Sequence, residues 1–259
     1  MGTKVKFFKK QKFNNAILFA GLPGIGLVGK IAVDYLLRQI KAVKVGEITS
    51  DSFPPSVHTK DGLVDLIKDE IFYFKNKSKD FLFISGPVQP ALDIRSTSMA
   101  EHYEFAETIV REVKKAGVKE IYTLAGINIG DKRMVKEPKI IIAATSKKIL
   151  AEWKKVGVIT DRPEGLISGA AGLLLGLAKE NGIEGACLMG ETNAKLIYGD
   201  QGAAKKVLEL LIRKYGFKIN MNKIQKEAKE IELSFSALAK QLEGQEETEQ
   251  PSEGISYVR

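Results

Sequence analysis

The sequence predicts an α/β fold in which a mostly parallel β-sheet lies between helices. Short apolar runs bounded by glycine, proline or charged residues recur along the chain, as expected for buried strands. Longer segments with the spacing of amphipathic helices lie between these runs. Because the two kinds of segment alternate, successive strands are expected to run parallel, with helices packed on both faces of the sheet.

The predicted strands begin with residues 16–20, where the run AILFA is stopped by a cluster of glycines. Further apolar runs with breakers at both ends predict strands at residues 63–67, 71–74, 81–85, 120–125, 140–143 and 186–189. The runs between residues 63 and 85 follow one another without an intervening helical segment. We therefore expect a hairpin insertion in this part of the sheet.

Helices are predicted between the strands. Residues 27–40 follow the first strand with helical spacing of their apolar side chains. The same spacing predicts helices at residues 99–116, 146–156, 169–181 and 201–215. A chain of 259 residues can bury a full core as one large domain, so we assign residues 1–220 to a single α/β domain.

The chain after residue 220 has a different pattern. Apolar side chains recur there at alternating intervals of four and three residues, which is the a/d repeat of a helix with one narrow buried stripe. This heptad stripe consists of Ile224, Ala228, Ile231, Phe235, Leu238 and Leu242. Asn222 is placed to cap the helix and Gly244 to end it, which gives a predicted amphipathic helix over residues 221–243. We expect the stripe to pack against its own body or a neighbouring subunit.

The final residues, 244–259, are acidic, contain a proline and have few apolar side chains, which is typical of a flexible tail. From Glu243 to the end, five acidic residues stand against one arginine, so this segment contributes −4 to a formal net charge of +8 and leaves +12 on residues 1–242. A basic body can attract nucleic acid. Its lysines are scattered among acidic residues except near the N-terminus, which favours a solvated lysine-rich surface over a nucleic-acid-binding one.

Composition excludes several classes of protein. Hydrophobic residues make up 44% and charged residues 28%, which is typical of a globular protein. No run approaches the ~18 apolar residues of a membrane-spanning helix, and no secretory signal is visible. A single cysteine, Cys187, excludes an intramolecular disulfide, and two histidines, His58 and His102, do not form a metal-ligand cluster. We expect a cytoplasmic protein without a metal or other cofactor.

The strongest candidate for a ligand-binding motif is the glycine-rich segment after the first strand. Gly24, Gly26 and Gly29 reproduce the GxGxxG spacing of a dinucleotide-binding loop. As a GxxxxGK phosphate-binding loop, the motif lacks the required hydroxyl, because Ile31 follows Lys30. The same glycines also allow a tight turn and close helix–sheet packing with no ligand. A nucleotide- or nucleoside-binding enzyme therefore stays open as an alternative.

Other candidate catalytic residues form no recognisable set. Glu47 and Asp51 lie near the distance at which a dinucleotide-binding loop has an acidic residue for ribose. Ser168 occurs in GLISG rather than in the GxSxG turn of a nucleophilic serine, and we expect it to cap a helix. Asp131, Lys132 and Arg133 follow a glycine-rich turn, where they either meet a ligand at the carboxyl edge of the sheet or cap a loop. We therefore predict that the protein is not an enzyme.

Two segments carry a resemblance to a known family: residues 19–29, with the sequence FAGLPGIGLVG, and residues 190–200, with the sequence GETNAKLIYGD. They look like the opening and the closing pattern of the archaeal proteasome assembly chaperone family. The helix at residues 203–211 and the sequence INMN at residues 219–222, which leads into the heptad-patterned helix, agree with the same pattern. The resemblance covers roughly residues 14–235.

The resemblance implies a fold like that of the purine nucleoside phosphorylases, without phosphorylase chemistry, and glycines that serve packing. Members of the family act as dimers or larger assemblies that bind proteasome α-subunits, and several end in a hydrophobic–tyrosine–any motif that docks between those subunits. Here Tyr257 is third from the end, before Val258 and Arg259, which is one residue or ~3.3 Å from the family's position, and Ser256 stands where the motif has a hydrophobic residue. We expect a homo-oligomeric chaperone or adaptor whose tails bind the proteasome α-ring, or another protein client, through these three residues.

Overall fold

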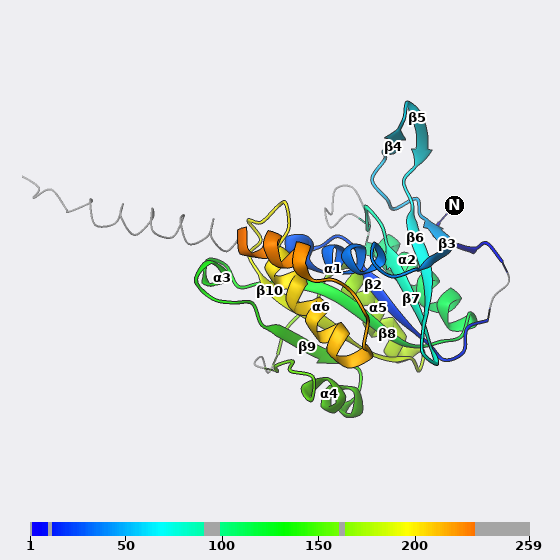
Figure 1. The fold of residues 1–259 in the computed structure, drawn as a ribbon. Helices are drawn as coiled ribbons and strands as arrows, with labels where there is room; N and C mark the ends of the chain where they lie inside the picture. Colours follow the sequence, from blue (N-terminus) through cyan, green and yellow to red (C-terminus); the bar gives the residue numbers. More distant parts are fainter. Residues whose placement is uncertain (1, 10–11, 91–98, 161–163, 231–259) are drawn as a thin grey trace, which may run out of the picture.

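The computed structural model describes residues 2–9, 12–90, 99–160 and 164–230. Its main sheet contains β1 (Lys4–Phe7), β2 (Ala16–Gly21), β3 (Val43–Thr49), β6 (Asp69–Asn76), β7 (Lys79–Ser85), β8 (Val118–Asn128), β9 (Ile140–Ala144) and β10 (Glu184–Thr192). The strands lie in the order β1-β3-β6-β7-β2-β8-β10-β9, and helices cover the sheet (Figure 1). The predicted α/β fold is confirmed.

Parallel pairing holds the centre of the sheet, where β7, β2, β8 and β10 run in the same direction. The outer neighbours are antiparallel, with β1, β3 and β6 on one side and β9 on the other. A short turn at Lys77 and Ser78 joins β6 to β7 and forms the expected hairpin. The sheet is therefore mixed, because such a turn leaves no room for the crossover helix that a parallel neighbour needs.

A second, two-stranded sheet, formed by β4 (Val57–Lys60) and β5 (Leu63–Leu66), stands out from the body (Figure 1). The strand predicted at residues 63–67 is present here, but it pairs with β4 instead of joining the main sheet. The sequence prediction lacks β1, β3 and β4. These strands mix polar and apolar side chains, so they contain no continuous apolar run; β1 and β3 are partly exposed, and every residue of β4 is exposed.

Helices cover both faces of the main sheet. α1 (Val28–Leu37), α4 (Lys147–Lys154) and α6 (Gln201–Tyr215) pack on one face, and α2 (Met99–Lys115) and α5 (Gly169–Glu180) on the other. Along β2, Ile17 and Phe19 face the first layer, whereas Leu18 and Ala20 face the second. Burial on both faces explains why the central strands are continuous apolar runs in the sequence. Within the described part of the chain, no helix is long and apolar enough to cross a membrane.

A C-terminal helix begins at Asn222 and continues through residue 230, where the described chain ends. The expected cap at Asn222 is wrong, because the N–H of Gln225 already bonds the carbonyl of Met221 at 2.9 Å and so includes Asn222 in the first turn. The side chain of Asn220 accepts the N–H of Asn222 at 2.8 Å. Ile224 and Ala228, the first two residues of the heptad stripe, are buried. The rest of the heptad stripe and the predicted binding residues of the tail lie outside the described residues: Ile231, Phe235, Leu238, Leu242, Tyr257, Val258 and Arg259.

Candidate functional site

The carboxyl ends of the parallel strands β2, β8 and β10 meet at one edge of the sheet. Ligands of open α/β sheets usually bind outside this edge, in the loops that follow the strands. The loops here are the glycine-rich loop after β2, with the 3₁₀ turn η1 (Ile25–Leu27), residues 129–131 after β8, and residues 193–200 after β10. The structure therefore brings the glycines and Asp131 to the same edge.

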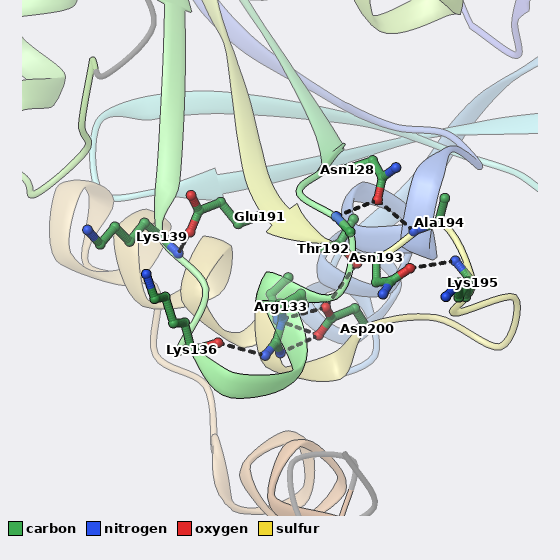
Figure 2. Close-up of polar contacts among 12 residues, drawn as sticks. Asn128, Arg133, Lys136, Lys139, Glu191, Thr192, Asn193, Ala194, Lys195 and Asp200 are labelled. Carbon is green, nitrogen blue, oxygen red and sulfur yellow. Dashed lines mark hydrogen bonds and ion pairs between the residues drawn. The ribbon is translucent and has the colours of Figure 1, made fainter. Parts of the chain in front are cut away.

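Arg133 of the short helix α3 (Lys132–Val135) and Asp200 form a buried ion pair at this edge (Figure 2). Arg133 Nε donates to one carboxylate oxygen at 2.8 Å, and Nη2 donates to the other at 2.9 Å. The same carboxylate accepts from the Thr192 hydroxyl and from the backbone N–H of Ala203, each at 2.9 Å. Each oxygen thus has two donors, so the burial of the charges is compensated within the chain.

The sequence indicates only a loop or ligand role for Arg133 and gives no role at this site to Asp200. Asp200 caps α6 through the N–H of Ala203, and an acidic residue directly before a helix is an N-cap signal that the sequence contains. The sequence contains no comparable pattern that would predict the pairing of Asp200 with Arg133. The two residues meet only because β8 and β10 lie side by side in the folded sheet.

The glycine-rich loop is fastened to this ion pair and packed against the strands. The backbone N–H of Asp200 donates to the carbonyl of Gly26 at 2.8 Å. Gly26 has a φ of 60°, and a Cβ on it would lie 2.4 Å from the Thr192 hydroxyl. A Cβ on Gly29 would lie 2.0 Å from the carbonyl oxygen of Leu124. Close packing within the chain therefore accounts for both glycines without a ligand.

Gly24 differs from these two, because a Cβ on it would have no neighbour within 4 Å. Its backbone is extended, with a φ of −164°, which any residue adopts. Glu47, one of the two candidate ribose-binding acids, lies on β3, which β6 and β7 separate from β2. Its carboxylate instead pairs with Lys68 at 3.4 Å. The structure therefore does not bring Glu47 to the glycine-rich loop.

Polar side chains around the loops bond to one another. Asn128 Oδ1 accepts the N–H of Ala194 at 3.0 Å (Figure 2). Asp131 accepts from the side chains of Lys195 and Asn193, each at 3.2 Å, and these contacts, that of the lysine above all, hold the pKa of Asp131 below its usual value. These bonds join the loop after β8 to the loop after β10. They support the loop-capping role for Asp131 over the ligand-binding one.

Residues capable of nucleophilic or acid–base chemistry are dispersed. Ser168 is the N-cap residue of α5, as predicted, although its hydroxyl makes no capping bond. Cys187 is buried in β10, and burial raises the pKa of its thiol to about 11, which keeps the thiol protonated at neutral pH. His102 lies on α2. Among the described residues, no group of three or more His, Cys, Asp and Glu could hold a metal ion.

A cavity of about 200 Å³ lies between the glycine-rich loop and the start of α5. Apolar side chains of β8, α5 and the loop form much of its wall. Gln89, which also lines it, donates through Nε2 to the Pro23 carbonyl at 2.5 Å and accepts through Oε1 from the Ala170 N–H at 3.2 Å. The amide of Gln89 is thus already used to join the glycine-rich loop to α5.

Large apolar side chains are exposed on the loops around this edge. We call them the apolar rim: Ile25, Val135, Leu166, Ile197 and Tyr198. Their exposed fractions range from 44% for Ile25 to 98% for Leu166. Exposed apolar side chains gathered on one side of a protein are typical of protein-binding surfaces. The edge therefore combines an internally bonded polar layer with apolar contacts available to another protein.

Comparisons with known proteins point in the same direction. The family model described as the PAC2 family matches residues 18–239. An uncharacterized protein of Methanocaldococcus jannaschii is 37% identical over 223 residues, which span 86% of this chain and 82% of that protein. Among solved structures, Pyrococcus furiosus PbaB, an archaeal proteasome activator, shares 30% identity at a TM-score of 0.82, over 92% of this chain and 99% of PbaB. Pyrococcus furiosus PbaA, an archaeal homolog of proteasome-assembly chaperone, shares 25% identity at a TM-score of 0.71, over 95% of each chain.

Proposed function

This chain belongs to the PAC2 family, and from that premise we propose that it is a cytoplasmic, protein-binding chaperone or adaptor of the proteasome and not an enzyme. The similarity to PbaB in both fold and sequence, over nearly the whole of both chains, carries the proposal. PbaB is described as a proteasome activator, and PbaA as a homolog of a proteasome-assembly chaperone. We extend this class of partner to the present chain.

The carboxyl edge of the sheet supports a binding role. Gly26 and Gly29 are accounted for by packing, and Arg133 and Asp200 neutralise each other. The apolar rim above them offers surface that a protein partner could bury. Burial of apolar surface contributes roughly 25 cal/mol per Å² removed from water.

We further propose that the chain forms a homo-oligomer that presents several tails. Residues 1–220 form the body, residues 221–243 the helix, and residues 244–259 a tail that binds through Tyr257, Val258 and Arg259. Ile224 packs in the core layer of its own subunit and Ala228 is buried, and in this proposal the later stripe residues pack against a neighbouring subunit. Several tails on one assembly raise avidity without strengthening any single contact. Such avidity suits a tail whose tyrosine is displaced by one residue from the family motif.

A pull-down with the proteasome core particle tests this function. The full chain is compared with a chain that ends at Glu243, and binding by the full chain alone is expected. A third chain that lacks only Arg259 places Tyr257 in the penultimate position, as in the family motif, and should bind at least as tightly as the full chain. Failure of every form to bind would remove the proteasome from this account.

The alternative function is a nucleotide- or nucleoside-binding enzyme that uses Gly24, Gly26 and Gly29. Only Gly24 has open space around it, where it lines the small apolar cavity. The packing of Gly26 and Gly29 and the distant position of Glu47 make this alternative weaker than the binding role. Calorimetric titration with nucleotides and nucleosides separates the enzyme from the binding protein.

A further inference from the structure

A groove of about 640 Å³ lies between the segment after β8, helix α6 and the C-terminal helix. Pro138, Gly202 and Ala228 line it and are buried, so they form its floor. Its volume falls within the ~300–1,000 Å³ that is typical of ligand pockets. A stretch of peptide therefore fits the groove by size.

Lysines border this groove, and we call it the lysine groove: its basic residues are Lys136, Lys205, Lys206 and Lys229. Glu137 is the acidic residue among its lining, and it pairs with Lys206 at 3.0 Å. Lys205 lies 3.7 Å from Glu209 of α6. Lys136 and Lys229 are exposed, and within the described ranges neither forms an ion pair. The lysine groove therefore has an excess of positive charge that an acidic ligand would neutralise.

Both walls of the lysine groove are held in place by bonds to the body. Arg133 Nη1 donates to the carbonyl of Lys136 at 3.1 Å, which fixes that wall to the buried ion pair (Figure 2). On the other wall, the Tyr35 hydroxyl donates to the Asn220 carbonyl at 2.7 Å and accepts from the Ile224 N–H at 3.3 Å. The groove is thus formed in advance. The entropy cost of docking falls mainly on whatever occupies it.

The chain itself contains a segment of the opposite charge. Residues 243–253 include five glutamates and no basic residue. The described helix ends at residue 230, directly after Lys229. Residues 231–242 lie between that point and the acidic segment. As a helix they would span ~18 Å at 1.5 Å per residue, and the acidic segment, at ~3.3 Å per residue when extended, is long enough to return over that distance.

We propose that the acidic segment, residues 243–253, docks in the lysine groove of its own chain. The opposite charges favour this contact, and covalent attachment raises the local concentration of the segment far above that of a separate peptide. The consequence rests on the proposed function: docking holds Tyr257, Val258 and Arg259 close to the body until a proteasome competes for the tail. The groove would therefore set how much of the tail is available for binding.

Fluorescence anisotropy of the full-length chain tests the docking in the absence of any proteasome. A dye attached through Ser252→Cys labels the segment alone, because the single natural cysteine, Cys187, is fully buried. We expect high anisotropy at about 0.01 M salt and a fall toward that of a labelled free peptide at about 1 M salt, as the Debye length shrinks from ~30 Å to ~3 Å. The double variant Lys136→Glu with Lys229→Glu should show the low value at every salt concentration.

The matched control is Lys119→Glu with Lys179→Glu, which makes the same change in charge on exposed lysines at the amino end of β8 and near the end of α5. It should behave like the unmodified chain. Equal anisotropy in the unmodified chain and both double variants would overturn the docking. Anisotropy that still rises with protein concentration after sedimentation velocity shows complete assembly would overturn docking within one chain. Because no proteasome is present, failure here leaves the pull-down result, and with it the proposed function, unaffected.

Discussion

The hydroxyl of Tyr35 on α1 accepts a hydrogen bond from the backbone N–H of Ile224 at 3.3 Å and so ties the start of the C-terminal helix to the body. Ile224 is fully buried in the layer formed by α1 and α6. Ala228, one turn later, is 5% exposed. The heptad stripe thus begins as part of its own subunit's core. The role of its later residues stays a prediction.

We predict that Ile231→Asp combined with Leu238→Asp dissociates the oligomer and leaves the body folded. Each fully buried large apolar side chain contributes ~1.5–3 kcal/mol, and an aspartate in its place brings a charge that is costly to bury. Sedimentation velocity measures the subunit number. Ser236→Asp with Ala237→Asp adds the same charge to the opposite side of the predicted helix and should leave the assembly intact. An unchanged subunit number in the stripe variant would exclude the helix from the interface.

Loss of one partner of the buried ion pair should be strongly destabilising. Arg133→Met leaves Asp200 buried with an uncompensated charge, for which we expect a loss of ~3–5 kcal/mol in the free energy of unfolding. Urea denaturation measures this loss, and Thr192→Val, which removes only one donor to the carboxylate, should cost ~1–3 kcal/mol. Lys195→Met breaks the exposed pair with Asp131 and should leave the urea midpoint unchanged. Equal midpoints for Arg133→Met and Lys195→Met would contradict the structural role of the pair.

Adding one methyl group at each of two glycines tests whether close packing explains the glycine-rich loop. Gly29→Ala places a Cβ 2.0 Å from the Leu124 carbonyl oxygen and should destabilise the fold by ~1–3 kcal/mol, whereas Gly24→Ala meets no atom within 4 Å and should be tolerated. Urea midpoints compare the two variants.

Calorimetric titration of the unmodified chain with NAD, ATP and adenosine should give no binding heat. Micromolar binding that disappears in Gly26→Val would instead support the nucleotide alternative.

The carboxyl group of Asp69 on β6 should make stability depend on pH. This carboxyl group is fully buried and lies against Gly86. Within the described residues, neither of its oxygens has a hydrogen-bond partner of good geometry. The backbone of Val88 nevertheless lies close enough to lower the pKa of Asp69. Burial outweighs that contact and raises the pKa from 3.8 to about 8. Between these values the folded protein holds a proton that the unfolded chain releases. The free energy of unfolding therefore falls as pH rises from about 4 to about 8.

Asp69→Asn should remove this part of the pH dependence, because the amide does not titrate. The stability gained over the unmodified chain should be larger at pH 8 than at pH 5, and on the order of a few kcal/mol at most. Urea midpoints at the two pH values measure the difference. Asp61→Asn, in the turn between β4 and β5, is the control and should leave the slope as it is. A parallel shift of Asp69→Asn at both pH values would contradict the account.

The sequence predicts the central strands well because both of their faces are buried. Residues 16–20 and 81–84 are continuous apolar runs, and the structure covers each with helices on both sides. β1 and β3 contain no continuous apolar run. These outer strands are covered only in part, and they carry polar residues such as Lys4 and Lys44 among their apolar ones. Hydrophobic runs alone therefore find the centre of this sheet and miss its outer strands.

The candidate site is less predictable than the fold. The sequence marks Gly26 and Gly29 as positions without a side chain, and it leaves open whether a ligand or the chain itself needs the space. The structure shows that the chain itself occupies this space, because Thr192 and Leu124 lie against the two glycines from strands far along the chain. The pairing of Arg133 with Asp200 depends likewise on tertiary contacts between segments distant in sequence.

Binding of the Tyr257→Ala chain to an immobilised proteasome core particle tests the central claim most directly. A buried aromatic anchor is typical of an interface hot spot, so its loss should weaken binding at least ~10-fold, or ~1.4 kcal/mol, relative to the unmodified chain. Tyr103→Ala, which removes a 55% exposed tyrosine from α2, is the matched control and should bind like the unmodified chain. Retention of Tyr257→Ala as tight as that of the unmodified chain would contradict the proposal that the tail binds the proteasome.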